Sequence, residues 1–264
     1  MPGRSAELTR IAARVRRDLA RMARPAGVFD ARRYFRGSAD LRFHNVRTPS
    51  LRLLARTICV EQRGVWTVHT AVRFADLLVG DPYLETKAVA IEVLSTFRSA
   101  FAPDLLATWK HWLARGDSSN WATTDAICGR LIGPLLVDRP ALAEDVAGWR
   151  KDPNMWVRRA SAVGLVPLVR RGKALGLAYR VARALHPDKE DLIQKAVGWL
   201  LREAGKADAR RLEGYLREHG PKIPRTTIRY AIERFPGQER QVLMTATRRM
   251  PRAKRGRPCH AAAK

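Results

Sequence analysis

Apolar residues recur every three or four positions along most of the chain, which is the period of a helix that packs by one face. No segment shows the strict alternation of a half-buried strand. The pattern therefore predicts an all-α protein whose helices are separated by Gly, Pro and Asp. The predicted helices are Ala6–Met22, Pro49–Val60, Thr67–Val79, Leu84–Phe97, Pro103–Ala114, Trp121–Leu136, Pro140–Trp149, Met155–Val169, Ala174–Leu185, Asp191–Ala204, Ala207–Glu218 and Pro224–Arg234.

The helices form pairs, and the pairs recur at a period of roughly 35–40 residues. Three segments, Leu84–Leu94, Met155–Leu165 and Leu192–Leu201, share a polar or cationic start, small residues in the middle and an apolar end. This is typical of the second helix of HEAT-like repeats, which stack into a solenoid with one concave surface. We expect Arg159 and Lys195 to belong to a cationic stripe on that surface.

The net charge of the chain indicates which class of partner such a solenoid would bind. Among 264 residues, 50 are Lys or Arg and 25 are Asp or Glu, which gives a formal net charge of +25. A surplus of this size favours a polyanion, first nucleic acid and second an acidic membrane surface. No apolar run is long enough to predict a membrane span. Three scattered cysteines indicate neither a disulfide framework nor a metal site, so a reducing cytoplasm is expected.

The two ends of the chain have compositions of their own. Leu8–Arg24 is amphipathic and Arg-rich like a mitochondrial presequence, although nearby acidic residues interrupt that pattern. We expect one domain over residues 1–246 and a basic, disordered tail over 247–264. In the tail, Arg255-Gly256-Arg257-Pro258 is similar to the core of an AT-hook, or a chance match in an Arg-rich segment. If it is an AT-hook, Arg255 and Arg257 enter a narrow A·T minor groove and steepen the salt dependence of binding.

The segment around Trp121 and Asp125 is the first candidate for chemistry. A spacing of four places the indole and the carboxylate on one helix face, one turn apart. A fixed carboxylate can stabilise the oxocarbenium-like state through which a glycosidic bond breaks. The ordinary alternative is a core tryptophan beside a surface acid. Asn120 can cap the helix, which leaves Trp121 in the first turn.

Two further clusters combine tryptophan with cations. One is Trp156-Val157-Arg158-Arg159, and the other places Lys195 and Trp199 on one helix face, followed by Arg202. Core tryptophans beside solvated cations would explain either cluster alone. Gly198, in the middle of a predicted helix, costs about 1 kcal/mol against alanine and therefore suggests a close helix approach.

Taken in this order, the three clusters resemble the DNA alkylation repair family of HEAT-like repeat alkylpurine DNA glycosylases. The resemblance covers about Thr48 to Phe235. It is sharpest at Asn120–Asp125, Trp156–Ala160 and Ile193–Glu203, and Arg47-Thr48-Pro49 also resembles a family signature.

The resemblance implies a role for each matching residue. Trp121 and Trp199 would flank the deoxyribose of the lesion, Asp125 would be the catalytic acid, and Arg159 would contact a phosphate. Members of the family excise positively charged N3- and N7-alkylated purines from double-stranded DNA without flipping the base into a pocket. The resemblance implies no metal and no organic cofactor, and a monomer associated with the nucleoid in the cytoplasm. Further expected DNA contacts are Tyr34, Arg158, Lys195 and Arg202.

The chain departs from the family pattern at two positions. Ala122 stands where an acidic residue is frequent, and Asn45 stands where a glycine is frequent. Neither change removes Asp125, whose presence favours an enzyme. Two other functions remain open: a non-catalytic helical-repeat protein that binds damaged or branched DNA, and a scaffold for protein or RNA partners.

Overall fold

The computed structural model describes residues 2–27, 35 and 40–248. The chain is all-α, as its periodicity predicts, and within this part the β-structure is limited to an isolated bridge between Arg42 and Tyr83. The predictions for Tyr34, Arg255 and Arg257 lie outside the described residues, as does most of the predicted tail. No helix in the described part is long and apolar enough to cross a membrane.

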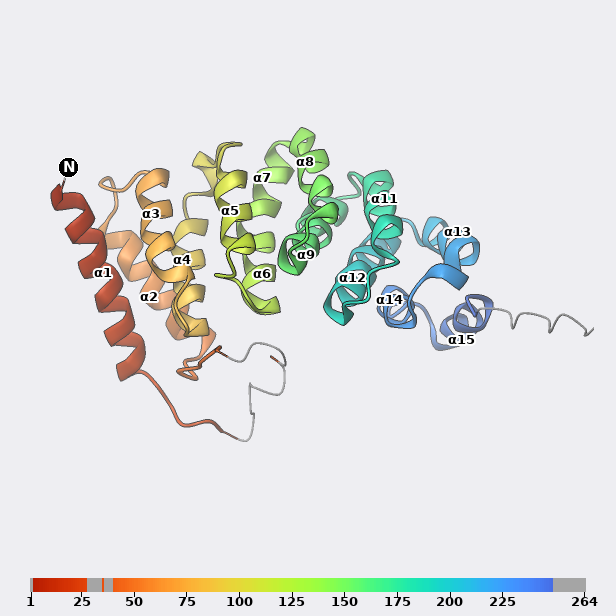
Figure 1. Ribbon diagram of the computed structural model, residues 1–264, viewed down its shortest axis with the longest axis horizontal. Coiled ribbons are helices and arrows are strands. Elements are labelled where there is room, and N and C mark those ends of the chain that lie inside the picture. The colour runs from red at the N-terminus through yellow and green to blue at the C-terminus, as the bar shows by residue number, and fades with distance from the viewer. Residues whose placement is uncertain (1, 28–34, 36–39, 249–264) are drawn as a thin grey trace, which may run out of the picture.

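Successive helices stand side by side in a bent row, with the first and the last described helix at opposite ends (Figure 1). One layer consists of helices that each contact the next: α2 (Thr48–Glu61), α4 (Leu84–Ser95), α6 (Trp121–Ile127), α9 (Met155–Val163), α12 (Asp191–Ala207) and α14 (Arg225–Ala231). We call this the inner layer. Six further helices pack along it: α1 (Pro2–Arg21), α3 (Val68–Val79), α5 (Leu105–Ala114), α8 (Ala143–Gly148), α11 (Leu175–Leu185) and α13 (Ala209–His219).

The repeat is visible in the positions at which the inner helices begin. From α4 onward they start at Leu84, Trp121, Met155, Asp191 and Arg225, so about 34 to 37 residues separate one start from the next. This confirms a helical-repeat architecture. One continuous apolar core lies between the layers, with the large side chains of Phe74, Trp109 and Trp112 fully buried in it.

The helix predicted over Trp121–Leu136 is interrupted. A π-helical turn, Cys128–Ile132, separates α6 from α7 (Gly133–Asp138). At Gly133 a Cβ atom would lie 2.3 Å from Cγ of Pro167, at the start of α10 (Val166–Val169), so only glycine allows this approach. A π turn adds a residue to the helical ladder and changes the direction in which the preceding side chains point. The turn directly follows the segment that contains Asp125.

The fold continues beyond the last helix that the sequence predicts. Helix α15 (Gly237–Ala246) has a weak apolar face, with Leu243 as its one buried residue, and for that reason its period is hard to recognise. Thr247, assigned above to the tail, is buried and accepts a hydrogen bond from Nη1 of Arg225 at 3.0 Å. The folded part therefore includes Thr247.

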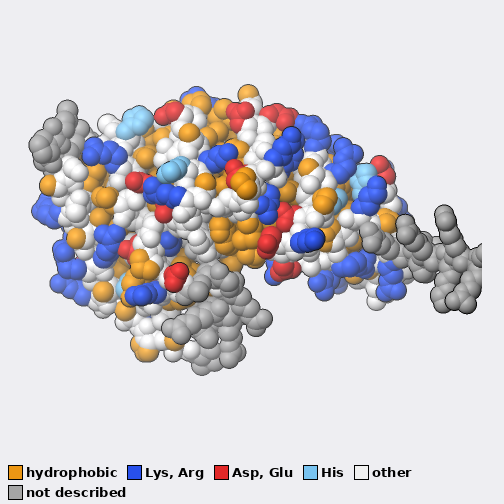
Figure 2. Space-filling view, viewed as in Figure 1, with side chains coloured by type: hydrophobic (Ala, Val, Ile, Leu, Met, Phe, Trp, Pro, Cys, Tyr) orange, Lys and Arg blue, Asp and Glu red, His pale blue; other side chains and the backbone are white. Residues whose placement is uncertain are grey.

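Lys and Arg side chains are spread widely over the face shown in Figure 2, and they are numerous at both ends of the row. Many of them lie over α1 and over the helices from α11 to α15. Acidic side chains are fewer and more scattered. Much of the charge surplus of the described residues is therefore visible on this face of the helical row.

Candidate active site

The inner layer contains a pocket of about 460 Å³ that is lined by side chains from several of its helices. Four of these helices contribute to it: α6, α9, α12 and α14. The structure thus gathers residues from four successive repeats, including most of the predicted site. The lining residues are Trp121, Asp125, Arg159, Leu192, Lys195, Trp199, Arg202 and Tyr230.

The carboxylate of Asp125 is held by the guanidinium of Arg159. Nε of Arg159 donates to Oδ1 and Nη2 donates to Oδ2, both at 2.8 Å. Nη1 donates in addition to the carbonyl oxygen of Leu192, which ties α9 to the first turn of α12. Such a two-point pair fixes the plane of a carboxylate as well as its position. Each carboxylate oxygen keeps acceptor capacity for a ligand in the pocket.

This pairing changes the expectation for Arg159. The residue is 5% exposed, so it does not belong to an exposed cationic stripe. The reason is tertiary: α9 packs against α6, and this contact brings the guanidinium to the largely buried carboxylate of Asp125. A phosphate contact by Arg159 remains a prediction. It requires the N–H groups that Asp125 and Leu192 leave unused.

The protonation of Asp125 is set by two opposing effects. Burial raises the pKa of its carboxyl group above the ordinary value, while the hydrogen bonds and the charge of Arg159 act to lower it. Arg159 is thus the group that favours the ionised form of this desolvated carboxyl group. A negative charge held in a pocket of limited solvent access interacts strongly with a cation placed beside it.

Trp121 lies in the first turn of α6, where the Asn120 side chain caps the helix by accepting from the backbone N–H of Thr123 at 2.8 Å. Its ring is half-buried and stacks on Phe35, with the centroids 5.1 Å apart and the planes 7° apart. Phe35 in turn contacts the ring of Phe43 at 5.3 Å. We did not predict Phe35 as a site residue, because no local period marks it in the sequence.

Helix α12 supplies the far wall of the pocket. Lys195 pairs with Asp191 at 2.6 Å, and Arg202 pairs with Glu233. Nε1 of Trp199 is buried and has no hydrogen-bond partner within the described part of the chain, while Nε of Arg202 lies 3.6 Å from Oε1 of Glu203, an ion pair without a hydrogen bond. A buried indole N–H without an acceptor suits a pocket that receives an acceptor from a ligand.

Gly198 explains how α12 reaches this position. A Cβ atom there would lie 2.4 Å from Cβ of Tyr230 and 2.8 Å from the carbonyl oxygen of Thr227. The predicted close approach is therefore an approach to α14. It places Trp199 beside the helix that carries Tyr230, on the wall opposite α6.

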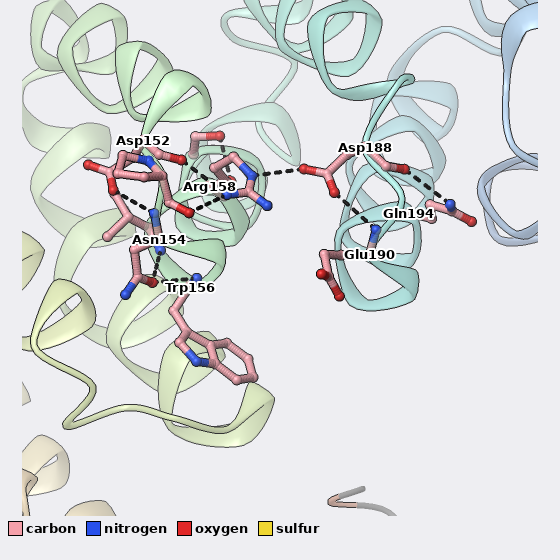
Figure 3. Close-up of polar contacts among 10 residues, drawn as sticks. Asp152, Asn154, Trp156, Arg158, Asp188, Glu190 and Gln194 are labelled. Carbon is pink, nitrogen blue, oxygen red and sulfur yellow. Dashed lines mark hydrogen bonds and ion pairs between the residues drawn. The ribbon is translucent and has the colours of Figure 1, made fainter. Parts of the chain in front are cut away.

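Arg158 is not part of the pocket. Its Nε donates to Oδ2 of Asp188 at 2.8 Å, and its Nη1 donates to the carbonyl oxygens of Asp152 and Pro153. In Figure 3 this arginine bridges the loop before α9 and the loop before α12, while the ring of Trp156 points away from the network. Because these contacts use Nε and Nη1, the structure gives Arg158 a structural role, and a DNA contact, which would fall to Nη2, stays a prediction.

The two departures from the family pattern have different structural settings. Asn45 has φ 58°, in the left-handed region that glycine adopts easily and that asparagine tolerates better than other residues. Its Nδ2 donates to the carbonyl oxygen of Arg24 at 2.9 Å. Ala122 lines a separate, mainly apolar pocket of about 250 Å³ between α2, α4 and α6, so it does not face Asp125.

The fold and the site together define a basic helical-repeat protein with a largely buried carboxylate in a pocket that two tryptophans also line. Residues 15–235 match the family described as DNA alkylation repair enzyme. The chain therefore belongs to this family, and it has a role in DNA repair with DNA as its substrate. A similar solved structure is described as a predicted DNA alkylation repair enzyme from Enterococcus faecalis; the TM-score is 0.67 at 16% identity, over 75% of this chain and 91% of that one. At this identity, the likeness supports the fold. A search of curated proteins finds no match.

Proposed function

We propose that the protein is a monofunctional DNA glycosylase that hydrolyses the N-glycosidic bond of cationic N3- and N7-alkylated purines in double-stranded DNA. The observation that carries the proposal is the Asp125 carboxylate, fixed by Arg159 in a pocket whose walls include Trp121 and Trp199. In this proposal the inner layer is the concave, DNA-binding side of a HEAT-like solenoid.

The chemistry follows from the charge of the substrate. An alkylated purine carries a positive charge and leaves as a neutral base when it takes the electrons of the glycosidic bond, so its departure needs no general acid. The positive charge then develops on the deoxyribose. Asp125 stabilises this charge and orients the water whose oxygen bonds to C1′, and the water proton passes to the carboxylate or to solvent.

The tryptophans and cations have supporting roles. The indole faces of Trp121 and Trp199 favour a nearby cation by about 0.5–2 kcal/mol each. Lys195 and Arg202 hold the flanking phosphates, in exchange for their present partners Asp191 and Glu233. Nε1 of Trp199 is a buried donor without a hydrogen bond to the described residues, and in this proposal it donates to an oxygen of the DNA.

The test is the release of free base from a duplex with one 7-methylguanine, with the undamaged duplex as the control. We expect release from the methylated duplex alone, and no metal or cofactor needs to be added. DNA binding without release of any base would instead place the protein with non-catalytic binders of damaged or branched DNA. Failure to bind DNA would instead favour the third function, in which the protein is a scaffold for protein or RNA partners.

A further inference from the structure

A second and larger cleft, of about 660 Å³, lies along the same inner layer. It shares Trp199 with the Asp125 pocket but no other lining residue. Its floor comes from the π turn, α7 and the α9–α10 segment. Its rim carries three arginines: Arg98, Arg170 and Arg171. We call it the arginine cleft.

The cations of the two pockets differ in whether they are paired. In the Asp125 pocket, the side chains of Arg159, Lys195 and Arg202 all have carboxylate partners. In the arginine cleft, the exposed side chains of Arg98 and Arg171 have no hydrogen bond and no ion pair with any described residue. Of these two pockets, the arginine cleft is therefore the one that carries uncompensated positive charge.

The third arginine of the cleft is positioned by a buried acid. The side chain of Glu203 is 1% exposed, and it accepts from Nε of Arg170 at 3.0 Å and from Nζ of Lys206 at 2.9 Å. Because Nε makes this bond, the two Nη groups of Arg170 remain for a ligand. The guanidinium carbon lies 5.8 Å from the centroid of the Trp199 ring.

One carboxylate, that of Asp138, also lines the cleft, against three guanidinium groups. The lining therefore favours an anion, and planar guanidinium groups with several N–H donors match the oxygens of a phosphate. Phosphodiester groups of a chain that continues from the Asp125 pocket would reach this cleft on the far side of Trp199.

From these observations we infer that the arginine cleft binds backbone phosphates of the DNA, as a second contact separate from the pocket around Asp125. Arg98 and Arg171 contact the phosphates directly, and Arg170 does so in the orientation set by Glu203. The inference takes from the proposed function only that the substrate is DNA, and it does not depend on excision of a base. With DNA bound on both sides, Trp199 is held between two anchored parts of the duplex.

The salt dependence of DNA binding tests this inference, because each neutralised phosphate contributes about 0.9 to the slope of log K against log salt on duplex DNA. The double variant R98Q/R171Q is compared with R63Q/R73Q, which removes the same charge from two exposed arginines that line neither pocket. Binding of an undamaged duplex to the full-length protein is measured by fluorescence anisotropy over a range of salt concentrations.

We expect the slope to fall by about 2 in R98Q/R171Q, because two phosphates are no longer neutralised and each contributes about 0.9. The slope of R63Q/R73Q should stay at the wild-type value. Equal slopes in the two variants would overturn the inference. A separate titration with inorganic phosphate at constant ionic strength distinguishes a site for free anions. If R98Q/R171Q weakened phosphate binding but left the DNA slope unchanged, the cleft would be a free-anion site and the inference would be wrong.

These outcomes are separable from those of the glycosylase assay. Base release with equal slopes would keep the proposed function and remove the second contact. A reduced slope without base release would keep the second contact and remove the proposed chemistry.

Discussion

The ring of Phe35 lies flat against the ring of Trp121, with the planes 7° apart and the centroids 5.1 Å apart. Phe43 supports Phe35 from a tilted contact at 5.3 Å. The segment before α2 thus reaches the first turn of α6 and supports a tryptophan that lines the Asp125 pocket. This contact joins parts of the chain that no local pattern in the sequence connects.

Replacement of Phe35 by alanine is expected to slow base excision. An aromatic pair contributes about 0.5–1.5 kcal/mol beyond the area it buries, so a loss of roughly 2- to 10-fold in the single-turnover rate is expected if Trp121 becomes less well oriented. Phe35→Leu keeps the apolar contact but not the stacking, so its rate should lie between that of wild type and that of Phe35→Ala. An unchanged or higher rate in Phe35→Ala would show that the stack does not support the site.

Arg159 is expected to control the ionisation of Asp125. Burial raises the pKa of this carboxyl group, and Arg159 opposes the increase. In Arg159→Gln the opposition is lost, so the pKa rises further and the acid limb of the pH–rate profile moves to higher pH. Single-turnover base release measured across pH for both proteins gives this shift. Acid limbs at the same pH would mean that Arg159 does not set the charge of Asp125.

The same substitution should also destabilise the protein. Removal of one partner of a buried ion pair costs about 3–5 kcal/mol when the remaining charge stays buried. Protonation of Asp125 reduces that cost, so the loss in unfolding free energy is expected to be smaller at low pH than at neutral pH. Urea unfolding at two pH values measures it, and an equal loss at both would contradict the expected coupling.

Glu203 is expected to stabilise the fold at neutral pH and to lose this effect in acid. Burial alone would raise its pKa, but the hydrogen bonds and charges of Arg170 and Lys206 lower it below the ordinary value. A carboxyl group whose pKa is lowered by folding stabilises the fold at pH values above its unfolded-state pKa of about 4.3. This stabilisation is lost as the pH falls through the folded-state pKa.

The variant Glu203→Gln should therefore be less stable than wild type at pH 7, by about 1–3 kcal/mol, because it loses charge-assisted hydrogen bonds. The difference should shrink as the pH is lowered below about 4.3, where the unfolded wild-type carboxyl group becomes protonated. Denaturant unfolding of both proteins at several pH values measures it. A difference that grows on acidification would have the wrong sign for this account.

Substitutions of Asn45 test how much its left-handed backbone conformation costs in stability. Its φ of 58° costs roughly 1–2 kcal/mol for a residue with a Cβ, and more for a β-branched one. We expect Asn45→Val to lower the unfolding free energy by about that amount. Asn45→Gly should be close to neutral, because the easier backbone conformation offsets the lost bond to Arg24. Equal effects of valine and glycine would show that backbone strain is not the cause.

The sequence predicted the parts of the molecule that depend on local pattern. Helical periodicity indicated the helix pairs and their spacing, and the i,i+4 spacing placed Trp121 with Asp125 and Lys195 with Trp199 on shared faces. All four line the same pocket. The π turn does not follow from local pattern, and neither does the close approach of Gly133 to Pro167 directly after it, which is a tertiary contact.

The partners of charged side chains could not be predicted from the local sequence pattern either, because they also depend on tertiary contacts. Arg158 and Arg159 are adjacent in the sequence, yet one binds Asp188 and the other binds Asp125. Only the packing of α9 against its neighbours decides which arginine faces which acid. The unpaired state of Arg98 and Arg171 within the described part of the chain likewise depends on where acidic residues from other repeats come to lie.

The most direct test of the account is single-turnover release of 7-methylguanine from duplex DNA by wild type, Asp125→Asn and Asp145→Asn. Asp145 is an exposed acid on α8, so its variant matches the change in charge outside the pocket. We predict a loss of at least about 100-fold in Asp125→Asn, with DNA binding retained, and a wild-type rate in Asp145→Asn. A wild-type rate in Asp125→Asn would contradict the central claim that this carboxylate stabilises the cationic deoxyribose.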